Sequence, residues 1–244
     1  MTTYTFGDDS SAVERLHLVA SAYHAVSRAF LEAHAPAGAG VALDLGCGPG
    51  FSTQLVDDVC SPGALIGIDS SDRFLAVARA TVPRAVFTTH DVSAAPLPRA
   101  PADLMYARLL LAHLPDPLAT ARRWTSDLAP GGVLLVEDLE DIEAPAGPLR
   151  AYDEVSARIV RHGGGVMYGG AALAPLGGRR TPVTVRAAAA ARIYRFNVRR
   201  WIADPGVPVP GDELRRLLGE LDAVATDDHG ATVSWIVRQI ALRP

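Results

Sequence analysis

Short apolar segments alternate with helical patterns through the first 140 residues, and this alternation constrains the fold more than any other feature of the chain. We expect strands at 41–45, 65–68, 85–89, 103–106 and 133–137. Strands that alternate with helices form a parallel sheet that is covered by helices on both faces. The pattern therefore predicts an α/β fold with such a sheet at its centre.

The segments on either side of this alternation predict further elements. Apolar residues recur at a spacing of three and four from 10 to 34, which indicates one or two amphipathic helices before the first strand. Two further strands are expected at 182–186 and 233–241, and a helix at 188–203. The stretch 163–178 is rich in glycine, so its backbone is weakly constrained.

Composition excludes several classes of function. All 23 basic residues are arginines, so no Schiff-base lysine and no P-loop lysine exists here. The net charge of −4 argues against a nucleic-acid or anionic-membrane partner. Cys47 and Cys60 form neither a disulfide framework nor a zinc motif. With a polar, acidic N-terminus and no apolar stretch of about 20 residues, the sequence predicts a soluble cytoplasmic protein.

The segment "VALDLGCGPG", residues 41–50, joins the first predicted strand to a helix through three glycines. In an open parallel sheet, ligands bind outside the carboxyl ends of the strands, and the first turn after a strand is the usual cofactor site. Glycines at 46, 48 and 50 let the backbone approach a ligand closely. Asp69 closes the second strand in "LIGIDSS", and an acid there accepts ribose hydroxyls. The ligand is therefore expected to be a nucleoside.

The charge of this turn restricts the nucleoside further. Dinucleotide sites use the spacing G-x-G-x-x-G, whereas this chain has G-x-G-x-G with Asp44 two residues before the first glycine. A carboxylate repels a pyrophosphate and attracts an ammonium group. We therefore expect a ligand that carries a cation.

Five motifs in the same order resemble those of S-adenosylmethionine-dependent methyltransferases with the Rossmann-like, seven-stranded fold. They are "VALDLGCGPG", "GIDSS", "HDVS", "YARLLLAHLPDP" and "LAPGGVLLVED", which together cover about residues 38–140. The resemblance implies a mostly parallel seven-stranded sheet whose last two strands are antiparallel. The interval of about forty residues between the candidate sixth and seventh strands departs from that pattern, which leaves the sixth strand uncertain.

The resemblance also implies which residues bind S-adenosylmethionine. The methionine amine is expected near Asp44 and the turn, the ribose at Asp69, and the adenine amine at Asp91 with the backbone of Val92. Two residues at the end of the fourth strand occupy positions where the family usually contacts the cofactor. The full expected set is Asp44, Gly46, Cys47, Gly48, Gly50, Asp69, Ser70, Asp91, Val92, Ala107 and Arg108.

The N-terminal segment with "YHAVSRAFL" resembles that of actinobacterial small-molecule members of this family. The resemblance implies one domain, in which an N-terminal helical segment and an insertion after the fifth strand cover the substrate. The expected parts of 1–244 are a helical cover at 1–37, a cofactor-binding core at 38–140, a lid insertion at 141–180, and C-terminal strands and helices at 181–244. Helices at the N-terminus suit either a monomer or a homodimer.

Candidate catalytic residues are drawn from the ends of the predicted strands, the lid insertion and the N-terminal helical segment. Methyl transfer to oxygen or nitrogen gains from a general base near neutrality, and histidine is the usual one. The candidates are His113, Tyr106 at a strand end, Tyr168 in the lid, and Tyr23 and His24 in the N-terminal helix. Packing is the alternative role for His113, Tyr23 and His24, and for Tyr106 the alternative is a wall of the pocket. Glu137 and Asp138 close the fifth strand, but nothing else assembles an oxygen-rich metal site, so no metal is expected.

The predicted function is methyl transfer to a small, largely apolar acceptor of the natural-product type. Oxygen, nitrogen and carbon nucleophiles remain open, including a ring carbon of an indole or phenol. One alternative is an enzyme of the same fold that binds the cofactor and catalyses a cyclisation or rearrangement without methyl transfer. Another is a protein that only senses the cofactor.

Overall fold

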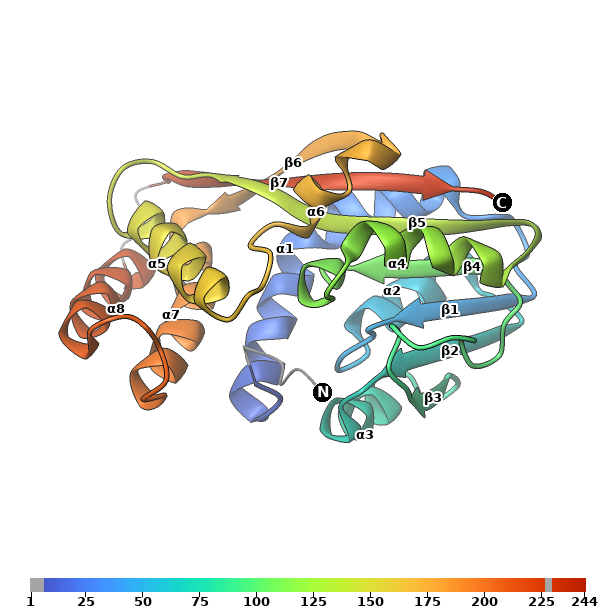
Figure 1. Cartoon of the computed structure of the whole chain (residues 1–244), viewed down its shortest axis with the longest axis horizontal. Helices are drawn as coiled ribbons and strands as arrows, with labels where there is room; N and C mark the ends of the chain where they lie inside the picture. Colours follow the sequence, from blue (N-terminus) through green and yellow to red (C-terminus); the bar gives the residue numbers. More distant parts are fainter. Residues whose placement is uncertain (1–6, 227–229) are drawn as a thin grey trace.

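A seven-stranded sheet forms the centre of the computed structural model, which describes residues 7–226 and 230–244 (Figure 1). The strand order is β3-β2-β1-β4-β5-β7-β6. The pairs from β3 to β5 are parallel, and β7 is antiparallel to both β5 and β6. The strands are β1 (Val41–Leu45), β2 (Ala64–Asp69), β3 (Val86–Thr89), β4 (Ala102–Arg108), β5 (Leu128–Glu143), β6 (Arg179–Arg186) and β7 (Thr232–Leu242).

All seven expected strands are present, so the predicted fold class is confirmed. The chain runs outward from β1 to β2 and β3, and then returns to place β4 and β5 on the other side of β1. The strand order therefore reverses at β1, which is the position where open α/β sheets bind ligands. The carboxyl ends of β1, β2 and β4 meet there, and we call this the catalytic edge.

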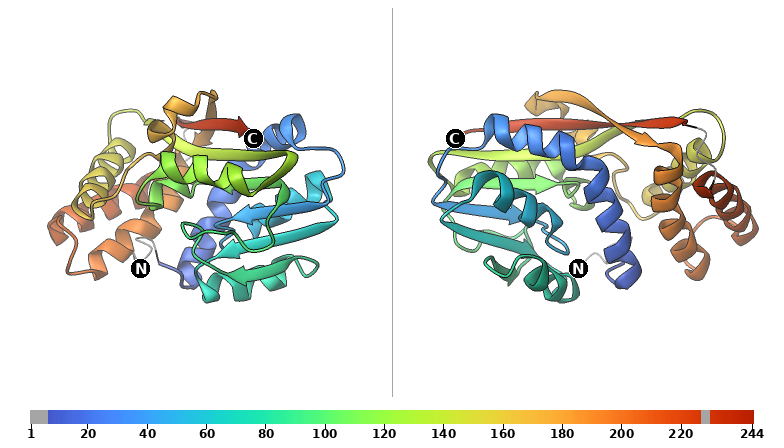
Figure 2. Two further views of the ribbon diagram at one scale, coloured as in Figure 1. Left: turned by 45° about the vertical axis from the view of Figure 1, so that its right-hand side comes forward. Right: turned by 180° about the vertical axis from the view of Figure 1, so that it is seen from behind.

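Helices cover both faces of the sheet (Figure 2). The end of α1, with α2 and α3, packs on one face around Phe30, Leu31 and Leu75. The other face carries α4, η1 and α6 around Leu111 and Trp124. The helices are α1 (Ser10–His34), α2 (Phe51–Cys60), α3 (Asp72–Thr81), α4 (Pro117–Trp124), α5 (Pro148–His162), α6 (Gly169–Ala172), α7 (Ala187–Ala203) and α8 (Gly211–Thr226), with short 3₁₀ turns η1 (Leu111–His113), η2 (Thr125–Asp127) and η3 (Ala174–Leu176).

The fifth strand is much longer than its sequence pattern predicts. It pairs with β4 as far as Glu137 and then continues to Glu143 with β7 alone. The helices α5, α7 and α8 pack on this extension and form a helical module beside the core (Figure 1). The interval between the sixth and seventh strands is filled by α7 and α8, which accounts for its unusual length.

Aromatic rings stack inside the helical module. The rings of Tyr152 and Tyr194 are 3.8 Å apart and nearly parallel at 6°, and Tyr152 also stacks on Trp201 at 5.6 Å. Tyr23 of α1 stacks on Trp235 of β7 at 5.6 Å. Since α1 contributes Phe30 to the sheet core and Tyr23 to this cluster, it joins the two parts of the molecule. No helix within residues 7–226 and 230–244 is long and apolar enough to cross a membrane.

Candidate active site

The glycine turn between β1 and α2 requires its glycines. Gly46, Gly48 and Gly50 have φ angles of 65°, 52° and 88°, in the left-handed region that other residues rarely adopt. A Cβ atom at Gly46 would lie 2.5 Å from Leu110 Cδ1, and one at Gly50 would lie 3.0 Å from Ala78 Cα. The turn is therefore packed on both sides, and its backbone is left as the surface that a ligand meets.

Asp44 lies beneath this turn and is fully buried. Its Oδ2 accepts hydrogen bonds from Ser52 Oγ at 2.7 Å and Thr53 Oγ1 at 2.6 Å. Its Oδ1 is also buried and has no hydrogen-bond partner among the described residues. Burial raises the pKa of Asp44 to about 6, because the charged form loses hydration that the two hydroxyls only partly replace. A cation above the turn would stabilise the ionised carboxylate, so this residue fits a positively charged ligand.

Asp69 at the end of β2 faces the same turn. Its Oδ2 accepts a hydrogen bond of 2.9 Å from Gly48 N, and its Oδ1 accepts one of 2.8 Å from Ser71 N. Burial raises its pKa, and the charge of Asp8 contributes to the same effect. Each carboxylate oxygen has a second lone pair, and the residue is only half-buried, so two ribose hydroxyls can still bind. Ser70 beside it is exposed.

Asp91 and Val92 follow β3 at the next position along the edge. Asp91 is exposed, and its Oδ1 accepts hydrogen bonds from the backbone N–H and the hydroxyl of Ser93, which lower its pKa. The carbonyl of Val92 accepts hydrogen bonds from Arg123 at 2.7 Å and from Trp124 Nε1 at 2.9 Å. That carbonyl therefore faces the core, and an adenine would meet the Asp91 carboxylate and the Val92 N–H.

Three other expected cofactor residues are placed beneath or beside the edge. Cys47 is buried, and its backbone N–H donates to Ile68 O at 3.0 Å, which ties the turn to β2. Ala107 is also buried, so both residues offer a cofactor only their backbone. Arg108 reaches toward α1, where its guanidinium lies 3.5 Å from Ser27 Oγ.

His113 ends η1, directly after β4, and has accessible surface although the protein surrounds it. Burial lowers its pKa to about 4, and the guanidinium of Arg15 adds to this effect. The exposed side chain lies close to the carboxyl end of β4, where a ligand can reach it. The imidazole is therefore neutral at physiological pH and can accept a hydrogen bond there.

Arg15 is the functional candidate that sequence reasoning missed. It comes from α1, is buried, and affects the pKa of both His113 and Tyr152 of α5. Its signal in the sequence was a charged residue on the apolar stripe of the first helix, between Ala12 and Leu16. Because its charge acts on both of these side chains, Arg15 is a candidate for contact with a ligand bound beside them.

The lid candidate Tyr168 is tied to the helical module. Its hydroxyl donates a short hydrogen bond to Asp153 of α5, and the ring packs against the aromatic cluster. Burial and the carboxylate of Asp153 raise the pKa of Tyr168 above its usual value. Tyr168 therefore stays protonated.

Three expected catalytic residues do not reach the site as bases. Tyr106 is not at the end of its strand, since β4 continues to Arg108, and its fully buried hydroxyl donates a short hydrogen bond to Glu137. Tyr23 is 1% exposed and stacked on Trp235, because it lies on the apolar face of α1. His24 follows it and is exposed, about 100° around the helix from Tyr23.

We predict that Tyr106 contributes to stability rather than to catalysis. Glu137 is fully buried between the Tyr106 hydroxyl and Gln239 Nε2, which donates to it at 2.6 Å. The substitution Tyr106→Phe should lower the free energy of unfolding by about 1–3 kcal/mol, because a buried carboxylate loses one of its two donors. Denaturant unfolding measures this loss, with the half-buried Tyr168→Phe as control. An unchanged stability would contradict the assignment.

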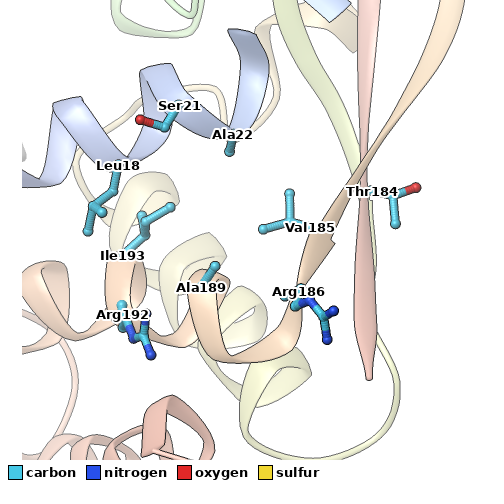
Figure 3. A pocket seen from close by; sticks show the side chains of 9 residues that line it. All are labelled: Leu18, Ser21, Ala22, Thr184, Val185, Arg186, Ala189, Arg192 and Ile193. Carbon is cyan, nitrogen blue, oxygen red and sulfur yellow. The ribbon is translucent and has the colours of Figure 1, made fainter. Parts of the chain in front are cut away.

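A separate cavity of about 380 Å³ lies between α1, β6 and α7, away from the catalytic edge (Figure 3). Its lining includes Leu18, Val185 and Ile193, with Arg186 and Arg192 at its rim, and none of the expected site residues. The cavity is therefore distinct from the cofactor site. Within residues 7–226 and 230–244, no group of three or more His, Cys, Asp or Glu side chains is arranged to hold a metal ion.

Comparisons with known proteins agree with this geometry. Residues 43–136 match the model of the family described as "Methyltransferase domain". The chain is 32% identical over 206 residues to the trans-aconitate 2-methyltransferase of Azoarcus sp. (strain BH72), and this match covers 84% of this chain and 70% of that relative. The chain belongs to the S-adenosylmethionine-dependent methyltransferase family.

A second relative matches over a shorter stretch of the chain. The trans-aconitate 2-methyltransferase of Methylobacterium radiotolerans is 42% identical over 105 residues, so the match spans 40% of that relative and 43% of this chain. Among solved structures, the YcgJ protein of Bacillus subtilis has a TM-score of 0.55 at 15% identity, covering 91% of this chain and 99% of its own. The [4+2]-cyclase SpnF has a TM-score of 0.51 at 18% identity, covering 90% and 80%. These structures share the fold.

S-adenosylmethionine affinity should depend on pH through Asp44. The pKa of its carboxyl is about 6 without a ligand, so it is protonated below that pH and carries the charge that attracts the methionine ammonium only above it. We expect affinity to rise between pH 5 and 7, with a proton released on binding near pH 6. Calorimetry in buffers of different ionisation enthalpy measures the proton, and Asp44→Asn should abolish it. A pH-independent affinity of the native protein would contradict this assignment.

Proposed function

We propose that this protein transfers the methyl group of S-adenosylmethionine to a small acceptor bound beside His113, between η1, α1 and α5. The observation that carries the proposal is the position of His113 and Arg15. η1 begins three residues after β4, so His113 lies next to the edge where Asp44 and Asp69 would hold the cofactor. Acceptor and cofactor would therefore meet at the carboxyl end of β4.

The residues of the edge have separate tasks in this proposal. Asp69 binds the ribose hydroxyls, Asp91 and the Val92 N–H bind the adenine, and Asp44 stabilises the methionine ammonium. When bound, S-adenosylmethionine supplies a methyl group on a sulfonium; the acceptor forms a bond to that carbon as the bond to sulfur breaks. The protein then has to align the two molecules and exclude water. The helix α1 is the element that covers the glycine turn, since Leu16 Cδ1 would lie 3.9 Å from a Cβ atom at Gly48.

His113 suits an acceptor that carries a proton. Its low pKa keeps the imidazole neutral beside a sulfonium, which an imidazolium would repel. A neutral imidazole can orient an acceptor O–H or N–H and receive the proton as methyl transfer proceeds. Because the pKa is only about 4, His113 would act as an orienting hydrogen-bond acceptor more than as a strong base.

The acceptor we propose has a largely apolar body of the natural-product type and one anionic group. The aromatic cluster next to Arg15 supports the apolar body, because Tyr152 both stacks in that cluster and responds to the Arg15 charge. The anionic group is supported by the positive charge of Arg15, which acts on both His113 and Tyr152. The relatives are named for trans-aconitate, which is a carboxylate. A carboxylate oxygen is therefore the second type of acceptor to test.

A panel of acceptors tests the proposal. The protein is incubated with S-adenosylmethionine and with matched pairs of aromatic acids, phenols, indoles, amines and trans-aconitate, and S-adenosylhomocysteine is measured by mass spectrometry. We expect acceptor-dependent product with anionic members, and a selective loss of these in Arg15→Gln. Rearrangement of an acceptor without S-adenosylhomocysteine would replace the proposal with the cyclisation alternative. S-adenosylhomocysteine formed without any methylated product would contradict methyl transfer to these acceptors.

A further inference from the structure

Asp138 is a buried carboxylate beside the proposed acceptor site that the reaction does not use. It is 1% exposed and follows Glu137, the last residue of β5 that pairs with β4. Its Oδ2 accepts a hydrogen bond of 2.7 Å from the backbone N–H of Leu111, the first residue of η1. The carboxylate therefore holds the start of the three-residue turn that ends with His113.

The turn that Asp138 holds needs external support. Leu109, which follows β4, has a φ angle of 54°, an unfavourable backbone conformation for a residue with a branched side chain. Its N–H donates to Glu137 O at 2.7 Å. The backbone N–H groups of Leu110, Leu111 and Ala112 stabilise the ionised form of Asp138, although burial raises its pKa to about 7 overall. Asp138 is thus the anchor on which successive backbone donors of the turn converge.

The lid segment 163–178 contacts the same anchor through two glycines. A Cβ atom at Gly169 would lie 2.7 Å from Asp138 Oδ1 and 2.6 Å from Ala112 N. One at Gly170 would lie 2.6 Å from Asp138 O. Real Cβ atoms do not approach other atoms this closely, so α6 can pack on η1 and β5 only because both residues are glycines.

We propose that Asp138 is a positioning residue that couples the lid segment to His113. It holds η1 in the conformation that presents His113 to the acceptor, and α6 packs only on that conformation. The inference rests on the proposed function, because that function places His113 at the acceptor. Asp138 itself contacts neither the acceptor nor the cofactor in this scheme.

Two variants disturb this contact from opposite sides. Asp138→Ala removes the carboxyl group that accepts the hydrogen bond from Leu111 N, whether that group is ionised or protonated. Gly169→Ala leaves the carboxyl group intact and pushes α6 away from Ala112 N. Gly219→Ala in α8 is the matched control, because a Cβ atom there meets nothing within 4 Å. If Asp138→Ala does not fold, Gly169→Ala and its control still decide the question.

The primary readout is the titration of the His113 imidazole by NMR, assigned from the signal that disappears in His113→Gln. The native midpoint should be near 4, and both variants should move it upward by about one pH unit or more, because a displaced η1 moves the ring away from the surrounding protein and from the Arg15 guanidinium, which lower its pKa. Gly219→Ala should leave it unchanged. This readout needs no acceptor, so a failure of the inference is distinguishable from a failure of the proposed function.

Kinetics with a productive acceptor provide the second readout. Both variants should lower kcat by about 10-fold or more, with the Kd for S-adenosylmethionine changed less than about two-fold. The double variant should be no slower than the slower single variant, because both act through one turn. A native-like His113 midpoint in both folded variants would overturn the inference, as would a loss confined to cofactor affinity.

Discussion

His113→Ala should lower kcat for a proton-bearing acceptor by about 100-fold, with the affinity for S-adenosylmethionine unchanged. General-base and orienting groups contribute about 10²- to 10⁴-fold, and a histidine with so low a pKa belongs at the lower end of that range. The affinity should be preserved because the cofactor residues lie on β1, β2 and the segment after β3. Single-turnover kinetics and calorimetry measure the two quantities separately.

The control for this substitution is His24→Ala, since His24 is exposed on α1. At saturating S-adenosylmethionine the native rate should also stay level from pH 5 to 8 and fall below about pH 5, because His113, with a pKa of about 4, becomes protonated only there. An unchanged kcat in His113→Ala would contradict the role of His113. So would a rate that follows an unperturbed histidine near pH 6.5.

Asp69→Ala should weaken the binding of S-adenosylmethionine by about 30- to 150-fold. This corresponds to about 2–3 kcal/mol. The loss of charge-assisted hydrogen bonds to a ligand typically has a value of this size. The substitution removes the acceptor for the ribose hydroxyls, and it also releases Gly48 N, which Asp69 holds at 2.9 Å within the glycine turn. Calorimetric titration measures the change.

Asp58→Ala is the matched control for Asp69→Ala, because Asp58 is an exposed acid on α2. It should leave the Kd unchanged. S-adenosylhomocysteine should lose affinity in Asp69→Ala by a similar factor, since it carries the same ribose. Native affinity in Asp69→Ala would remove this residue from the site.

The core of the fold was predictable because its signals are local. The pattern around Gly46 and Gly50 combines an apolar strand with a turn whose backbone angles residues other than glycine rarely adopt. The structure has the strand and the turn where the sequence predicts them. The acid at the end of β2 was predictable for the same reason, because its position along the strand decides its place at the edge. Site residues carried by the turns of a parallel sheet can be read from spacing alone.

Residues whose roles depend on distant partners were not predictable in this way. Tyr106 looks like a residue at a strand end until Glu137 and Gln239, far away in the sequence, bury its hydroxyl. Arg15 lies on an apolar stripe, and its neighbour His113 comes from a different element of the fold. The length of β5 was hidden as well, because its extension is paired by β7 and packed by helices that follow later in the chain.

The most direct test of the central claim is a calorimetric titration of the native protein with S-adenosylmethionine and, in parallel, with NAD⁺. The account predicts one molecule of S-adenosylmethionine bound per chain and no measurable binding of NAD⁺. The reason is that the buried carboxylate of Asp44, whose Oδ1 has no hydrogen-bond partner among the described residues, favours a cation over a pyrophosphate at the glycine turn. Absence of S-adenosylmethionine binding, or a preference for NAD⁺, would contradict the account.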